Sequence, residues 1–224
     1  MDGRVLDIII KSFPKILIPG LTMTIPLSVV SFAIGLVLAL LTALARITNM
    51  KVLKQISSFY VWFFRGTPLL VQIFIIFYGL PSIGLLINPV PAAIIAFSLN
   101  VGAYASECMR AAIESIPKGQ MEAGLCAGMS YWQIMRRIIL PQAMRVAFPT
   151  LGNTFIGLLK DTSLAANITV TDMFLVTERL VAKTYEPMVL YCEVAVIYLA
   201  FCTILTQVQK WGEKKLTVQH KETA

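Results

Sequence analysis

The sequence predicts an all-α integral membrane protein with five transmembrane helices, and three observations support this prediction. The 224 residues are 57% hydrophobic and only 14% charged. Their mean hydropathy of +0.76 is too apolar for a water-soluble domain of this size. Several uncharged runs also approach the roughly 20 helical residues needed to cross a hydrocarbon layer about 30 Å thick.

The five predicted spans follow one another along the chain. The first lies within residues 16–45, which carry no charge, and the second covers about residues 56–80. The third covers about residues 92–113, after the uncharged turn PSIGLLINPVP. The fourth begins near Val146, and the fifth runs from Pro187 to about Trp211. We therefore expect one transmembrane permease domain over residues 16–211, an external amphipathic segment at residues 1–15 and a cytoplasmic tail at residues 212–224.

The distribution of Lys and Arg predicts the orientation. With the C-terminus inside, twelve basic residues are cytoplasmic: Arg46, Lys51, Lys54, Arg110, Lys118, Arg136, Arg137, Arg145, Lys210, Lys214, Lys215 and Lys221. Six are external: Arg4, Lys11, Lys15, Lys160, Arg179 and Lys183. Because cytoplasmic loops carry an excess of Lys and Arg, this division predicts an outside N-terminus and an inside C-terminus. It also accounts for most of the net charge of +7, so no nucleic-acid partner is expected.

The loop between the third and fourth spans, about residues 115–142, predicts two short helices with a sharp joint. Pro117 suits the start of the first helix, and Gly128 suits a joint with positive φ. Ser130 followed by Gln133 matches a capping box for the second helix. Pro141 is expected to limit how far that helix continues.

Charged residues within or close to the predicted spans are candidates for a translocation pathway. Lys160 and Asp161 follow Arg145 after too few residues for a crossing, and Thr162 and Ser163 suggest a helix that breaks and restarts there. Such a restart would offer backbone N–H groups to a carboxylate. The alternative is a Lys–Asp pair at the outer interface, with the lysine stem snorkelling.

Glu107 and Arg110 share a face of the third span and could line the same pathway. The alternative is an ion pair within one helix near its cytoplasmic end, without substrate contact. Arg65 precedes a Gly and a Pro that interrupt the second span, which makes it a lesser candidate near a gate.

The stretch EAGLCAGMSYWQIMRRIILP resembles the cytoplasmic EAA loop of ABC-importer permeases. Gly124 stands where that family usually has Ala, and the residues that match the pattern are Glu122, Ala123, Gly128, Ile138, Leu140 and Pro141. The resemblance implies a coupling helix that sits in a cleft of an ATP-hydrolysing subunit. The alternative is a cytoplasmic helical hairpin without a partner.

Four further segments resemble, in order, the permeases of polar amino-acid ABC importers of type I: FFRGTPLLVQ, GAYASECMRAAIESIPKGQ, MRRIILPQAMR and LLKDTSLAA. The segments IFYGLPSIG and INPVPAAIIAFSLNVGAYASE look closest to cystine-type permeases. The resemblance implies a multi-pass protein of the bacterial cell membrane that carries L-cystine or another polar amino acid such as glutamine, arginine or histidine. The implied partners are two ATPase subunits, an external solute-binding protein and a second permease copy, in a homodimer or with a close homologue.

The sequence argues against an enzyme. It lacks the pattern GxxxxGK[ST], so ATP and Mg²⁺ are expected in the partner ATPase and no cofactor is expected on this chain. Four scattered cysteines and the single His220 do not build a metal site. An ATP-independent channel or facilitator remains the alternative from a different class, and the lack of His within the spans disfavours an intramembrane enzyme.

Overall fold

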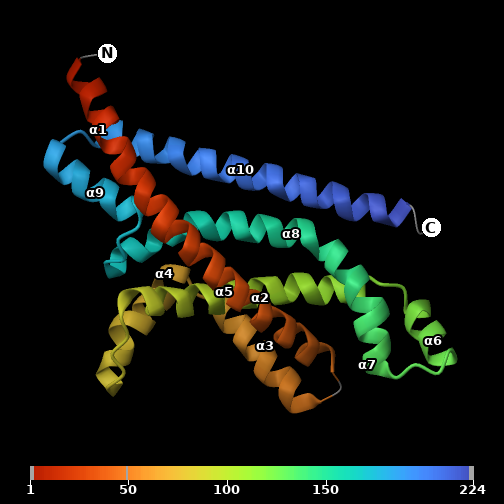
Figure 1. Ribbon diagram of the computed structural model, residues 1–224. Helices are drawn as coiled ribbons and strands as arrows, with labels where there is room; N and C mark the ends of the chain where they lie inside the picture. Colours follow the sequence, from red (N-terminus) through yellow and green to blue (C-terminus); the bar gives the residue numbers. More distant parts are fainter. Residues whose placement is uncertain (1–2, 49, 222–224) are drawn as a thin grey trace.

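The computed structural model describes residues 3–48 and 50–221, and the regular elements in that part of the chain are all helical (Figure 1). In chain order these are α1 (Gly3–Pro19), the π-turn η1 (Gly20–Thr24), α2 (Ile25–Ile47), α3 (Lys51–Gly66), α4 (Leu69–Phe74), the π-turn η2 (Ile75–Gly79), the 3₁₀ turn η3 (Leu80–Ile83), α5 (Pro89–Glu114), α6 (Lys118–Cys126), α7 (Tyr131–Ile134), the π-turn η4 (Met135–Ile139), α8 (Leu140–Asp161), the 3₁₀ helix η5 (Thr162–Ile168), α9 (Met173–Thr184) and α10 (Pro187–Lys221). The all-α prediction is confirmed for these residues.

The first predicted span is part of a much longer helix. α1 passes through η1 into α2 without a break, because the N–H of Ile25 donates to the carbonyl of Gly20 across the π-turn. Of the segment expected to lie apart at residues 1–15, residues 3–15 belong to this continuous helix, and residues 1–2 lie outside the described part of the chain. Its inner face packs on α9 and α10, where Ile16 is fully buried against Met173 and Leu190.

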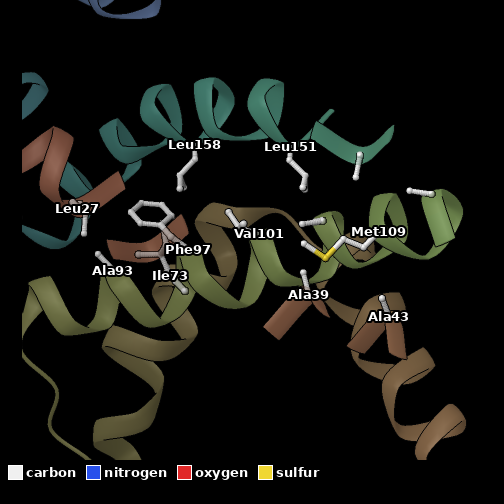
Figure 2. Packing of buried hydrophobic residues seen from close by; sticks show 14 of the residues in the cluster. Leu27, Ala39, Ala43, Ile73, Ala93, Phe97, Val101, Met109, Leu151 and Leu158 are labelled. Carbon is white, nitrogen blue, oxygen red and sulfur yellow. The ribbon is translucent and has the colours of Figure 1, made fainter. Parts of the chain in front are cut away.

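Small residues hold α2 against α5. The buried positions of α2 recur every four residues at Ser31, Gly35, Ala39 and Ala43. A Cβ on Gly35 would lie 2.7 Å from Cγ1 of Val101, so the two backbones approach as closely as the side chains allow. Figure 2 shows Ala39 and Ala43 on one side of α5, and Leu151 and Leu158 pointing at it from α8 on the other. α5 is therefore the centre of the core.

Three helical stretches are long and apolar enough to cross a membrane: Arg4–Ile47, Pro89–Glu114 and Pro187–Leu216. A fourth crossing is possible if α3 and the segment Leu69–Ile83, bent by 108° at Thr67 and Pro68, form one broken span. α8, which corresponds to the fourth predicted span, does not meet the same test of length and composition among the described residues. The structure thus gives three or four candidate spans.

Pro141 does not end the helix that begins at Tyr131, so this expectation was wrong. α7, η4 and α8 form one continuous segment, with Pro141 at the start of α8. A proline is tolerated there because the π-turn shifts the hydrogen-bond pattern, with the N–H of Leu140 donating to the carbonyl of Met135. Figure 1 shows the segment bending between the labels α7 and α8, as expected where a π-turn and a proline interrupt the ladder.

Candidate functional site

The α6–α7 hairpin, residues 118–134, has the joint that the sequence predicts. Gly128 has φ of +78°. Two backbone N–H groups that follow the helix α6 donate hydrogen bonds to carbonyls of its last turn. The N–H of Met129 donates to the carbonyl of Gly124 at 3.0 Å, and the N–H of Gly128 donates to the carbonyl of Leu125 at 2.9 Å. This is a Schellman motif, which requires a left-handed residue at the position of Gly128. Ser130 and Gln133 then form the expected capping box.

Gly124 packs α6 directly against α7. It is the buried residue of α6, and a Cβ there would lie 2.7 Å from Cγ1 of Ile134. The alanine usual in the resembling family would therefore displace Ile134. Glycine at position 124 lets α6 and α7 approach closely.

The outer face of the hairpin is exposed and partly apolar. Glu122 and Ala123 are exposed, and Leu125, Tyr131 and Trp132 are 55%, 45% and 67% exposed. Large apolar and aromatic side chains at the surface are typical of protein contact sites. Sequence analysis missed Tyr131 and Trp132, although two aromatic residues directly after the predicted joint were a usable indication.

Glu107 forms the centre of a second site, an ion-pair cluster contributed by three helices. Its carboxylate pairs with Arg46 of α2, with Arg110 of α5 at 2.8 Å and with Arg65 of α3 at 3.7 Å. Arg110 also binds Glu114 at 2.7 Å. Three guanidinium groups against two carboxylates leave one positive charge in excess. The predicted contact between Glu107 and Arg110 is confirmed, and Arg46 is a member that sequence analysis missed.

Tyr104 connects this cluster with a cavity. The guanidinium carbon of Arg65 lies 5.4 Å from the centre of the Tyr104 ring, in a cation–π arrangement. The same tyrosine lines a cavity of about 400 Å³. Arg65 therefore belongs to the surroundings of the cavity as well as to the cluster around Glu107.

The cavity is bounded by the break between α3 and α4, the start of α4, and parts of α5, α8 and η5. The break between α3 and α4 contributes Thr67, α5 contributes Asn100 and Tyr104, and α8 contributes Asp161; the remaining lining residues are Pro68, Leu69, Phe97, Val101, Thr154, Gly157, Leu158 and Leu164. Its volume lies within the range of about 300–1,000 Å³ usual for small-molecule sites. A mostly apolar wall with a few polar groups is the common composition of such a site.

The four neighbouring candidates from α8 and η5 have different environments. Asp161 and Lys160 are both exposed, but Asp161 lines the cavity and Lys160 does not contribute to its wall. Thr162 is fully buried and donates to the carbonyl of Leu159 at 2.7 Å, and Ser163 donates to that of Lys160 at 2.8 Å. The helix does not break and restart at these residues, because the backbone continues from α8 directly into the 3₁₀ helix η5. The N–H of Thr162 donates to the carbonyl of Leu158, and the hydroxyls of Thr162 and Ser163 bind carbonyls of the preceding turn, so the expectation of free N–H groups at a restart was wrong.

The connection between α8 and α9 is mostly buried. It turns at Thr169, which has φ of +65°, and the N–H of Val170 donates to the carbonyl of Ala165. α9 begins after Asp172, whose Oδ1 accepts from the N–H of Leu175 at 2.8 Å while Oδ2 is buried without a partner. Burial of this carboxyl raises the pKa of Asp172 to about 6.

Within the part of the chain that the structure describes, no group of three or more His, Cys, Asp or Glu residues is arranged to hold a metal ion.

Comparison with protein families identifies one that covers most of the chain. The family described as binding-protein-dependent transport system inner membrane component matches residues 35–218.

Individual proteins match over at least 90% of both chains. The L-cystine transport system permease protein TcyB of Bacillus subtilis (strain 168) is 50% identical over 211 residues, which cover 94% of this chain and 90% of that protein. The glutamine transport system permease protein GlnP of Escherichia coli (strain K12) is 36% identical over 205 residues, covering 91% and 94%. A crystal structure of an amino acid ABC transporter with histidines matches with a TM-score of 0.85 and 32% identity, covering 92% of this chain and 96% of that one.

Proposed function

Because the chain belongs to the family of binding-protein-dependent transport system inner membrane components, as a permease of the polar amino-acid ABC importers, we propose that it carries L-cystine across the bacterial inner membrane. The observation that carries this proposal is the 50% identity with an L-cystine permease over nearly the whole chain. Glutamine, arginine and histidine are the alternative substrates, since a glutamine permease matches at 36%.

The cavity fits a zwitterionic amino acid. Asp161 presents a carboxylate that would bind an ammonium group. Arg65 lies on the face of Tyr104, which lines the cavity, and presents a guanidinium group that would bind a carboxylate. Glu107 and Arg110 keep the neighbouring cluster paired, and Lys160, Thr162 and Ser163 complete the pathway at the end of α8. We assign these residues to translocation.

The orientation is part of the same proposal. α3 and the bent segment after it form the second span, and α8 forms the fourth. This gives five spans within residues 16–211, with the N-terminus outside, the tail at residues 212–224 inside and the α6–α7 hairpin in the cytoplasm. Residues 1–15 extend beyond the outer surface, although residues 3–15 are continuous with the first span.

As a component of a binding-protein-dependent ABC system, the chain works with an ATPase and a solute-binding protein. We propose two ATPase copies and a homodimer of this chain, with the hairpin docked in the ATPase. Glu122, Ala123, Gly124, Gly128, Ile138, Leu140 and Pro141 are the residues assigned to this coupling. The exposed Leu125, Tyr131 and Trp132 support it, because an apolar surface of this kind needs a cover. ATP and Mg²⁺ then bind in the ATPase, and this chain hydrolyses nothing.

The test is uptake by proteoliposomes that contain this chain, its ATPase and its binding protein. Labelled L-cystine should enter only with ATP inside, and glutamine, arginine and histidine should enter much more slowly. Asp161→Asn, which keeps the shape and removes the charge, should lower uptake per assembled complex by about tenfold, a loss of about 1.4 kcal/mol. Asp7→Asn, at an exposed position paired with Lys11, is the matched control.

Three results would change the proposal. Faster uptake of another amino acid would replace cystine as the substrate. Uptake without ATP would favour a facilitator. Normal uptake by the Asp161→Asn variant would return Asp161 to a structural role at the membrane interface.

A further inference from the structure

A buried glutamine connects the bend between α3 and α4 with α5, and the bend and α5 both line the cavity. Gln72 of α4 is 2% exposed, and both ends of its side-chain amide are bonded. Nε2 lies 2.8 Å from the carbonyl oxygen of Phe64, 3.0 Å from that of Thr67 and 2.9 Å from Oγ1 of Thr67. Oε1 accepts from Nδ2 of Asn100 on α5 at 3.0 Å.

The bend creates the need for this amide. In a continuous helix the carbonyl of Phe64 would accept from the N–H four residues later, but that residue is Pro68, which has none. Thr67 has extended backbone at the end of α3, so its carbonyl also leaves the helical ladder. Unpaired backbone carbonyls are costly inside a protein or membrane. The two N–H groups of Gln72 satisfy them.

The orientation of the amide follows from its neighbours. The two carbonyls can only accept, and the hydroxyl of Thr67 already donates to the carbonyl of Phe63 at 2.9 Å. An amide turned the other way would place Oε1 against three acceptors and two N–H groups against the donor of Asn100. Gln72 therefore fits in one orientation and joins the end of α3 to α5.

Two of the residues that this amide joins line the cavity of the proposed pathway. Thr67 and Asn100 both line the cavity, and Arg65 stands two residues before Thr67. From these contacts we propose that Gln72 is a positioning residue: it sets the bend between α3 and α4 and so holds Thr67, Asn100 and Arg65 in register around the cavity. This inference rests on the proposed transport function and adds a residue that substrate never touches.

The experiment compares Gln72→Met with Gln72→Glu in reconstituted complexes, and uptake is divided by the amount of assembled permease and ATPase. Met matches glutamine in length but offers no hydrogen bond, whereas a protonated Glu keeps one O–H donor and the acceptor for Asn100. Positioning predicts the order Gln, Glu, Met for uptake, with Met at least about fivefold below wild type. A purely structural role predicts that Met, the more apolar residue, assembles and transports at least as well as Glu. Gln55→Met, the same change at an exposed position of α3, should transport like wild type.

Each outcome decides the question. Uptake by the Met variant equal to that of wild type or of the Glu variant would overturn the inference. If the Met variant does not assemble, the Glu variant is compared with wild type at pH 6 and pH 8. More of the Glu side chain is protonated at pH 6 and can donate a hydrogen bond. A ratio of Glu-variant uptake to wild-type uptake that is higher at pH 6 than at pH 8 supports positioning, and an equal ratio at the two pH values overturns it. Wild type that fails to transport would instead refute the proposed function.

Discussion

The α6–α7 hairpin and the connection between α8 and α9 lie at the two ends of one continuous helical segment, and both turn through a left-handed residue. The hairpin uses Gly128 and leaves nearly all of its surface exposed. The other connection uses Thr169 and buries Thr162, Ala165, Ile168 and Asp172. The same left-handed backbone turn thus serves two purposes. The exposed turn at Gly128 is accessible to a partner protein, whereas the mostly buried turn around Thr169 connects α8 with α9 and α10.

The largest effect is expected from Gly128→Trp. A Cβ added at this position meets no atom within 4 Å, but a residue with a Cβ at φ of +78° is strained by about 1–2 kcal/mol. The bulky ring would also disturb the proposed contact with the ATPase. Co-purified ATPase and ATP-dependent uptake should both fall by at least about tenfold. Gly119→Ala, at an open position without positive φ, is the control, and normal uptake by Gly128→Trp would refute docking at this face.

The second prediction concerns pH at the buried connection. Folding raises the pKa of Asp172 from 3.8 to about 6, so the folded state binds the extra proton between these values. Its contribution to stability is therefore largest below pH 4 and decreases as the pH rises to 6, by up to about 3 kcal/mol. Asp172→Asn keeps the acceptor for Leu175 and should flatten this part of the profile, and raise the melting temperature at pH 7. Melting of the purified complex at pH 5 and pH 7 checks this, with Asp7→Asn as control; parallel profiles for wild type and Asp172→Asn would contradict it.

The third prediction separates packing from turn formation within the hairpin. Gly124→Ala places a Cβ against Ile134 and should destabilise the hairpin by about 2 kcal/mol, because overpacked sites cost 1–3 kcal/mol. Hydrogen exchange of the α6 amides should become faster while that of α5 is unchanged. Adding Ile134→Val, which removes part of the crowding side chain, should restore much of the protection. An unchanged exchange rate in the single variant would show that Ile134 moves aside freely.

The smallest effect is expected from Thr169→Gly. A β-branched residue is strained at φ of +65°, and glycine adopts that conformation without a Cβ clash. Because glycine also gains entropy in the unfolded chain, the net stabilisation should be no more than about 1 kcal/mol. A melting temperature higher by a few degrees would match this estimate. A lower value would mean that the threonine side chain stabilises the turn by contacts that outweigh its strain.

Sequence patterns predicted the local features of both connections better than their surroundings. Gly128, Ser130 and Gln133 were placed correctly because turn and capping chemistry depends on residues a few positions apart. Pro141 was misjudged because the π-turn before it accommodates a proline. The roles of Thr162 and Ser163 were misjudged because their hydroxyls can bind the preceding carbonyls as readily as they cap a helix.

Long-range contacts were harder to foresee. The pairing of Glu107 with Arg110 follows from helical spacing, but that with Arg46 and Arg65 depends on how α2, α3 and α5 pack. The same holds for Gln72, whose partners lie on α3 and α5. The number of spans depends on whether the two helical segments on either side of the bend at Thr67 and Pro68 count as one span. It also depends on α8, which does not meet the test of length and hydropathy.

The stripe of Ser31, Gly35, Ala39 and Ala43 on α2 also affects the net stability of its contact with α5. Glycine and alanine have no rotamers to lose, so bringing this stripe against α5 freezes few side-chain torsions and costs little conformational entropy. Longer side chains at the same positions would have to be immobilised one by one. The contact between α2 and α5 therefore retains more of its packing free energy as net stability than a contact between long side chains would.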